Sequence, residues 1–267
     1  MSGLGKAINY KTSLILLVVL LVWGASSYSM NSNLINLDII LQSFSSQHIL
    51  GTDELGRDIL ARIIDGVQVA LLVGISVMLM AGIIGTVVGV VSGYFGGWVD
   101  IILMRITDIF LSFPGILMAI SFAALAGPGI ENVVFALGLM GWVSFARLAR
   151  IQTMAVKNND YISSAQINGV GSISIMAVYV LPNIVAPLIV EGVFTIAGAM
   201  MAEAGLSFLG IGIQAPDASL GAMLREGARY MLVAPHLVMV PGAVLMLLVL
   251  TLNLIGDKLR DKLDVRG

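Results

Sequence analysis

Five ionisable residues interrupt long apolar segments of the sequence: Asp100, Arg105, Asp108, Glu191 and Glu203. A charge in the middle of a membrane-spanning helix costs about 2.5–3.5 kcal/mol on insertion scales, so such residues are normally paired or face water. Arg105 and Asp108 are spaced i, i+3, which predicts a structural ion pair within one helix. A carboxylate that faces a translocation path attracts an amino group or a cationic chelate.

Glu191 and Glu203 have no obvious partner in their own segment. In one helix they are roughly 18 Å apart along the axis at about 1.5 Å per residue, so they lie at different depths, with Glu203 nearer the outside. One hypothesis places them on a translocation path. The other is a hydrogen-bonded lock between helices. The sequence does not separate the two for Glu203, and for Glu191 we favour the path.

The sequence lacks the residue patterns of common catalytic and metal sites. It has no cysteine, and its two histidines, His48 and His236, are far apart, so no metal site is expected. It has no G-x-x-x-x-G-K-[ST], H-E-x-x-H or G-x-S-x-G pattern, which argues against a P-loop and against hydrolase chemistry. A net charge of −2 gives no basic surface for nucleic acid. We therefore expect a chain that is not an enzyme and binds no cofactor itself.

The elements that must position the buried charges are membrane-spanning helices. Hydrophobic residues make up 58% of the sequence and charged residues 11%, with a mean hydropathy of +0.99, whereas a soluble domain carries about a quarter charged residues. A span needs about 20 apolar residues. The six expected spans are 13–29, 67–94, 99–126, 131–148, 177–211 and 237–255. The expected fold class is an all-α membrane protein.

Lysine and arginine give the orientation, because cytoplasmic loops collect positive charge. With the N-terminus inside, nine of these residues are cytoplasmic and four are external. Both termini and the loop 149–176 are therefore expected in the cytoplasm, and 31–66 and 213–235 outside. We divide the chain into a tail with the first span (1–30), an external segment (31–66) and a core of spans (67–267).

Two shorter patterns concern the second span. Gly85, Gly89 and Gly93 place small residues on one helical face, which predicts close packing against another helix. Ahead of this span, residues 48–66 read HILGTDELGRDILARIIDG. Thr52 or Asp53 is expected to cap the helix. An i, i+4 pair of Asp58 and Arg62 is expected on it. From the residues alone, this is a surface helix that stabilises the entry to the span.

Residues 160–182 combine a short helix, a glycine turn and a new apolar run. Gly169 and Gly171 break the helix, because glycine permits the positive φ of a sharp turn. The pattern predicts a rigid knob that projects from the membrane as a docking surface.

The spacing of this knob resembles the EAA loop of ABC-importer permeases, in which Glu-Ala-Ala is followed after three residues by Gly and ten residues later by Ile-x-Leu-Pro. Here Leu181-Pro182 match, Tyr179 stands at the Ile position, and the acidic residue is absent. The resemblance implies coupling to an ATPase through Ser163, Ser164, Ala165, Asn168, Gly169 and Gly171.

With the coupling loop, a motif before the second span and a block near the C-terminus make three ordered motifs, and the resemblance covers about residues 48–264. GTDELGRD precedes the second span, and AEAGLSFLGIGIQAP, LGAMLREGARYM and NLIGDKLRDKLD form a block near the C-terminus. They resemble the C-type permeases of the dipeptide, oligopeptide and nickel importer family. Leu220 stands where the family usually has Trp, and Val265 where it usually has Pro.

This resemblance implies a type I ABC importer permease with six spans and a cytoplasmic coupling helix, in a prokaryotic inner membrane. It implies a second permease, two cytoplasmic ATPases that bind ATP and Mg²⁺, and an external substrate-binding protein. The expected substrates are di- or oligopeptides, with glutathione or a nickel chelate as the alternative. A secondary transporter or channel, in which Glu191 or Glu203 holds a proton or cation, is the competing hypothesis; such folds often contain internal repeats, and none is apparent.

Overall fold

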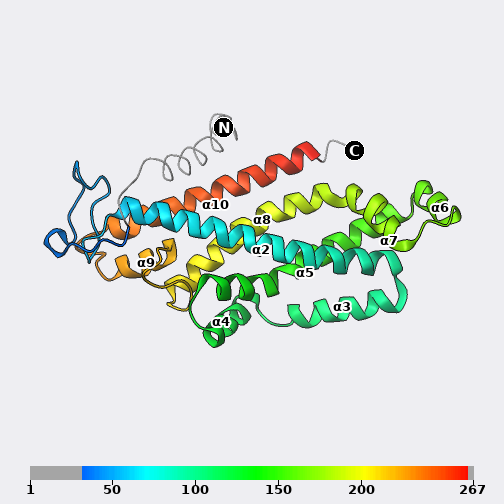
Figure 1. Ribbon diagram of the computed structural model, residues 1–267, viewed down its shortest axis with the longest axis horizontal. Helices are drawn as coiled ribbons and strands as arrows, with labels where there is room; N and C mark the ends of the chain where they lie inside the picture. Colours follow the sequence, from blue (N-terminus) through cyan, green and yellow to red (C-terminus); the bar gives the residue numbers. More distant parts are fainter. Residues whose placement is uncertain (1–31, 264–267) are drawn as a thin grey trace, which may run out of the picture.

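A computed structural model describes residues 32–263 of this chain, which are helical and contain no strand (Figure 1). The elements are η1 (Leu37–Ile39), α2 (Ile59–Phe95), α3 (Gly97–Leu111), α4 (Gly115–Ala126), α5 (Ile130–Lys157), α6 (Asp160–Ile167), α7 (Ser172–Ser174), η2 (Ile175–Val180), α8 (Leu181–Phe208), α9 (Leu220–Ala228) and α10 (His236–Leu263). The expected span at 13–29 lies outside the described residues.

Four helical stretches are long and apolar enough to cross a membrane: Ile59–Phe95, Ile130–Lys157, Ser172–Phe208 and His236–Leu263. The expected span at 99–126 is not one straight helix. It is divided into α3 and α4, which are bent by 78°. Pro114 explains the break, because proline has no N–H to donate and disfavours a helical conformation at the residue before it. The described residues therefore contain four spans, or five if the bent pair is one.

The centre of the bundle is the contact between α2 and α5. A Cβ built on Gly85 would meet the backbone oxygen of Trp142, and one on Gly89 would meet that of Ala146. At Gly93 the nearest atom would be the oxygen of Arg150 at 2.7 Å. The predicted close packing of the glycine face is thus confirmed, and its partner is α5.

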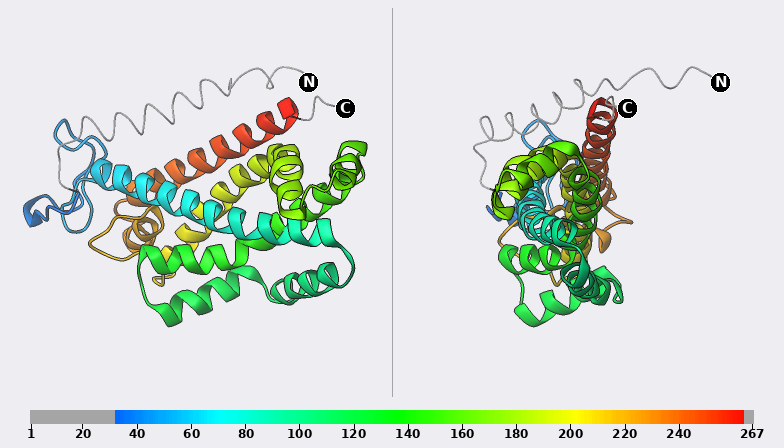
Figure 2. Two further views of the ribbon diagram at one scale, coloured as in Figure 1. Left: turned by 45° about the vertical axis from the view of Figure 1, so that its right-hand side comes forward. Right: turned by 90° about the vertical axis from the view of Figure 1, so that its right-hand side faces the viewer.

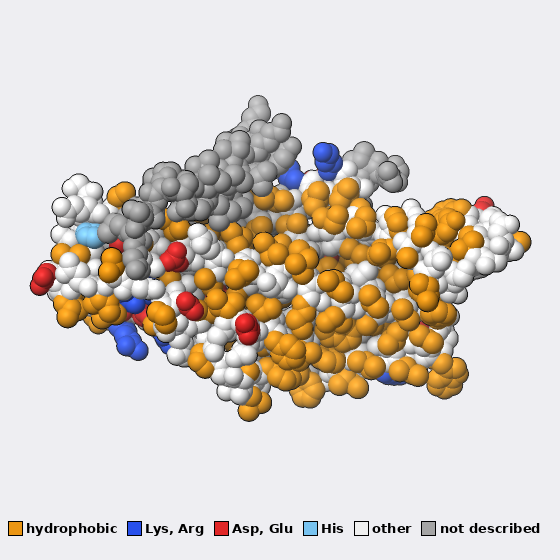
Figure 3. All heavy atoms as spheres, viewed as in Figure 1, with side chains coloured by type: hydrophobic (Ala, Val, Ile, Leu, Met, Phe, Trp, Pro, Cys, Tyr) orange, Lys and Arg blue, Asp and Glu red, His pale blue; other side chains and the backbone are white. Residues whose placement is uncertain are grey.

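The polar segments gather at two opposite ends of the bundle. Residues 32–58 and α9 lie at one end, and α6 and α7 extend at the other (Figures 1 and 2). Hydrophobic side chains cover much of the face between them (Figure 3). The expected external segments therefore share one end, and the expected coupling loop lies at the other.

Candidate functional site

The short helix α6 projects beyond the ends of the long helices (Figures 1 and 2). Its inner side is apolar and buried, with Ile162 and Ala165 at 0% and 7% exposure. Ser163, Ser164 and Asn168 are exposed. Of the six residues assigned to coupling, Ala165 therefore faces the body of the protein and cannot contact a partner extensively, whereas its neighbours can.

Gly169 makes the predicted turn after α6. Its φ is +78°, a value that side-chain-bearing residues rarely adopt, and no heavy atom lies within 4 Å of a Cβ placed there. The N–H of Val170 donates to the oxygen of Ala165 at 3.0 Å and completes the helix end. The glycine is thus required by backbone conformation and not by close packing. Gly171 has neither a positive φ nor a close neighbour.

Two exposed isoleucines flank this turn. Ile167 is 86% exposed and Ile173 is 79% exposed. Each is an exposed apolar side chain on an otherwise polar loop, which suits docking into a pocket of another protein. The sequence analysis assigned the coupling contact to serine, alanine, asparagine and glycine positions and missed these two isoleucines. An apolar residue on each side of a glycine turn could have indicated them.

Two hydrogen bonds at Tyr94 join α5 and α6 to α2. Lys157, the last residue of α5, donates to the backbone oxygen of Tyr94 in α2 at 2.6 Å. The amide of Gln166 in α6 donates to the hydroxyl of the same tyrosine at 3.4 Å. Ile162 and Ala165 also belong to one hydrophobic cluster with Tyr94 of α2 and Ala149 of α5, so α6 is packed against both long helices.

The expected ion pair within α3 is wrong, because Asp108 pairs with Arg147 of α5 at 2.8 Å instead of with Arg105. Asp100 is held in the same way by Arg150, whose Nη2 lies 2.6 Å from Oδ2. The i, i+3 spacing permits an intrahelical pair, but an arginine on the neighbouring helix competes for the same carboxylate. These contacts fasten α3 to α5.

The segment before α2 also differs from expectation. Asp58, and not Thr52 or Asp53, caps the helix by accepting from the N–H of Ala61 at 2.9 Å. Its other oxygen lies 2.9 Å from Nδ1 of His48. Arg62 itself reaches Asp53 and Glu226, and the segment is a folded loop that ends in a side-chain cap.

Arg62 belongs to a cluster that joins this loop to α9. Nη2 of Arg62 lies 3.2 Å from Oε2 of Glu226, and Arg57 approaches the same oxygen at 3.3 Å. The carboxylate of Asp53 also forms ion pairs with both Arg57 and Arg62. Burial raises the pKa of Glu54, a further carboxyl of this cluster. Asp53, Glu54 and Glu226 converge closely enough to hold a metal ion. Because two arginines already engage them, we interpret the group as a structural clamp.

Glu203 is fully buried in α8. Its Oε1 accepts a hydrogen bond from Oγ of Ser207 at 2.7 Å, and this hydroxyl accepts in turn from the N–H of Ile213 at 3.0 Å. The chain of bonds fixes the turn that follows α8. Ser207 belongs to the same helix, so this bond does not test the predicted lock between helices. The full burial of the carboxylate argues against an open path at Glu203 in this conformation.

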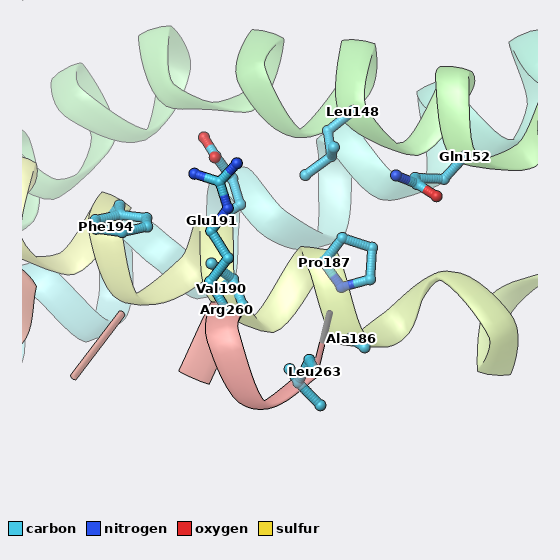
Figure 4. A pocket seen from close by; sticks show the side chains of 9 residues that line it. All are labelled: Leu148, Gln152, Ala186, Pro187, Val190, Glu191, Phe194, Arg260 and Leu263. Atoms are coloured by element: carbon cyan, nitrogen blue, oxygen red, sulfur yellow. The ribbon is translucent and has the colours of Figure 1, made fainter. Parts of the chain in front are cut away.

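Glu191 lies more than three helical turns before Glu203 in α8, at roughly 18 Å along the axis, and lines a cavity of about 560 Å³. The cavity lies between α5, α8 and α10 and is open on one side, and its walls are Leu148, Gln152, Ala186, Pro187, Val190, Glu191, Phe194, Arg260 and Leu263 (Figure 4). A second cavity of about 320 Å³ includes Ser144 of α5 and Thr195 of α8. The two cavities follow one another along the same pair of helices, because Ser144 and Leu148 are one helical turn apart.

Long apolar helices, a projecting helix at one end and cavities between the helices define an all-α membrane protein. Residues 85–266 match the family described as binding-protein-dependent transport system inner membrane component. The chain belongs to this family.

The chain is also similar to proteins that are named as transport permeases. The chain is 42% identical to the dipeptide transport system permease protein DppC of Haemophilus influenzae, over 81% of this chain and 74% of that protein. It is 40% identical to the glutathione transport system permease protein GsiD of Pectobacterium atrosepticum, over 94% and 83%. A chain of the MetNI methionine ABC transporter in an inward-facing conformation shares the fold, with a TM-score of 0.60, 17% identity, and coverage of 76% and 96%.

Proposed function

We propose that this chain is one of two permease subunits of an ATP-driven importer and forms half of a path for di- or oligopeptides. Family membership establishes a transport permease, and the names of the relatives support a peptide substrate. The observation that supports the coupling to a separate ATPase is α6, a helix that projects from the bundle, bonds to Tyr94 of α2 and packs through Ile162 against α2 and α5.

In this proposal, two cytoplasmic subunits bind ATP and Mg²⁺, and an external binding protein delivers the substrate. Closure of the ATPases moves α6, which shifts the attached helices and converts the bundle between inward-open and outward-open states. The described helices would lie in a prokaryotic inner membrane with α6 and both termini in the cytoplasm, as the distribution of lysine and arginine favours.

Glutathione is the second candidate substrate, because one relative at 40% identity transports it by name. A nickel chelate is the third candidate substrate, because the sequence motifs are shared with nickel importers. Import of a nickel chelate requires a path that accepts a cation. A secondary transporter would need no partner at α6.

The test is uptake by vesicles that contain this permease with its partner permease, ATPases and binding protein. Radiolabelled dialanine, glutathione and nickel with a small chelator are compared with and without internal ATP. ATP-dependent accumulation of dialanine is the expected result. Accumulation that requires an ion gradient and no ATP would refute the importer assignment, and accumulation of glutathione or nickel alone would correct the substrate.

A further inference from the structure

The cavity of about 560 Å³ carries one acidic and one basic side chain on different helices. Glu191 extends from α8 and Arg260 from the end of α10. Their charged ends point into the same part of the cavity (Figure 4). Within the part of the chain that the structure describes, neither forms an ion pair within 4.0 Å. Both charges are therefore available to a solute.

The remaining walls suit an organic solute. Leu148, Pro187 and Phe194 are apolar, and Gln152 supplies an amide that both donates and accepts hydrogen bonds. Ligand sites typically have volumes of about 300–1,000 Å³, mostly apolar walls and a few placed polar groups. A bare cation would meet Glu191 but would be repelled by Arg260. A solute with one positive and one negative end satisfies both.

We propose, on the basis of the import function above, that Glu191 and Arg260 form a subsite for the termini of a zwitterionic peptide. The carboxylate of Glu191 receives the α-ammonium group, and the guanidinium of Arg260 receives the α-carboxylate. Gln152 lies farther along the cavity, beyond Leu148, where its amide can bind a polar group of the rest of the peptide (Figure 4). The subsite lies in the half of the bundle nearer α6, so it holds the peptide late in its passage.

The adjoining cavity explains how a peptide reaches this point without being trapped. Its walls contain no charged residue and offer the hydroxyls of Ser144 and Thr195. A zwitterion therefore meets paired charges in only one of the two cavities. This separation allows release, because strong binding is confined to one step.

Binding of radiolabelled dialanine to the purified importer in nanodiscs tests the proposal. The complex is used without nucleotide and without the binding protein, so that only the permease cavities contribute. Equilibrium dialysis gives the Kd. We expect Glu191→Gln and Arg260→Gln each to weaken binding about 10-fold or more, since each removes a charged hydrogen-bond partner. Glu131→Gln and Lys262→Gln, which remove exposed charges outside the cavity, should leave the Kd unchanged.

Modified peptides assign each charge to its partner. N-acetyl-dialanine lacks the ammonium group, so its weaker binding should be insensitive to Glu191→Gln. Dialanine amide lacks the carboxylate and should be insensitive to Arg260→Gln. Basal ATP hydrolysis of each variant reports assembly, and Glu191→Asp and Arg260→Lys should retain most of the binding.

Several results would overturn the subsite. They are a Kd unchanged by both glutamine variants, losses in the charge-retaining variants as large as in the glutamine variants, or a wild-type complex that imports dialanine but does not bind it. Failure of the wild-type importer to accumulate any peptide would instead reject the proposed function.

Discussion

Arg62 at the start of α2 and Glu226 in α9 lie 3.2 Å apart, although they come from opposite parts of the sequence. The side chain of Arg62 is 2% exposed and that of Glu226 is 20% exposed. The pair fastens the loop before α2 to the helix between α8 and α10. It therefore fixes the shape of the end that is expected to face outward.

The first prediction concerns this clamp. Glu226→Gln leaves Arg62 without one of its two carboxylates and should lower the free energy of unfolding by about 1–3 kcal/mol. Thermal unfolding of the purified protein in detergent measures the effect, with Glu131→Gln as the exposed control. In a double-mutant cycle with Arg62→Gln, the two losses should be less than additive. Full additivity would show that the two side chains do not interact.

The second prediction concerns the glycine face of α2. Gly89→Ala places a methyl group against the backbone oxygen of Ala146, and such overpacking costs about 1–3 kcal/mol. Gly82→Ala is the matched control, because its nearest neighbour, Phe145, would lie at an ordinary 3.5 Å. Folded yield and melting temperature should fall for the first variant and not for the second. Equal behaviour would contradict the close packing of α2 and α5.

The third prediction concerns the turn after α6. Gly169→Val forces a β-branched residue into φ +78°, at a cost of about 1–3 kcal/mol. No atom is near enough to clash, so insertion should be normal while α6 is misplaced and ATP-driven uptake falls. Gly171→Ala, at an unstrained position, should retain uptake. Normal uptake and normal ATPase association in Gly169→Val would show that the loop is only a connector.

The fourth prediction separates the two hypotheses for Glu203. A lock contributes through hydrogen bonds, so Ser207→Ala, which removes the donor, should destabilise the protein by about 1–3 kcal/mol. Glu203→Gln should also destabilise it, while uptake per folded molecule stays unchanged. Thermal unfolding and vesicle uptake are measured on the same preparations. Reduced uptake without loss of stability in Glu203→Gln would support the path hypothesis instead.

The fifth prediction is topological, and it uses the absence of cysteine in the sequence. Ile40→Cys at the expected external end and Ile167→Cys on α6 introduce accessible thiols, since these residues are 44% and 86% exposed. An impermeant maleimide added to intact cells should label position 40 only, and permeabilised cells should add position 167. Labelling of 167 alone in intact cells would reverse the orientation.

Local patterns in the sequence were sufficient for several features of the site. The turn at Gly169 and the packing face of Gly85, Gly89 and Gly93 follow from residue type and spacing alone. The bend between α3 and α4 was missed because hydropathy measures how apolar a segment is and not its direction. Pro114 carried the signal.

Ion pairs between residues of different helices could not be predicted from these local patterns. Arg147 and Asp108, like Arg62 and Glu226, meet because of tertiary packing, which a single sequence does not specify. Arg260 was interpreted as one of many cytoplasmic positive charges. Only the position of α10 beside α8 brings it to the cavity of Glu191.

The contact of α2 and α5 has a mechanical consequence. At Gly85, Gly89 and Gly93 the two backbones come so close that no side chain of α2 separates them. Closely packed interiors have low compressibility and transmit strain. Under the proposed coupling, α2 and α5 therefore move together as one unit when the ATPases displace α6.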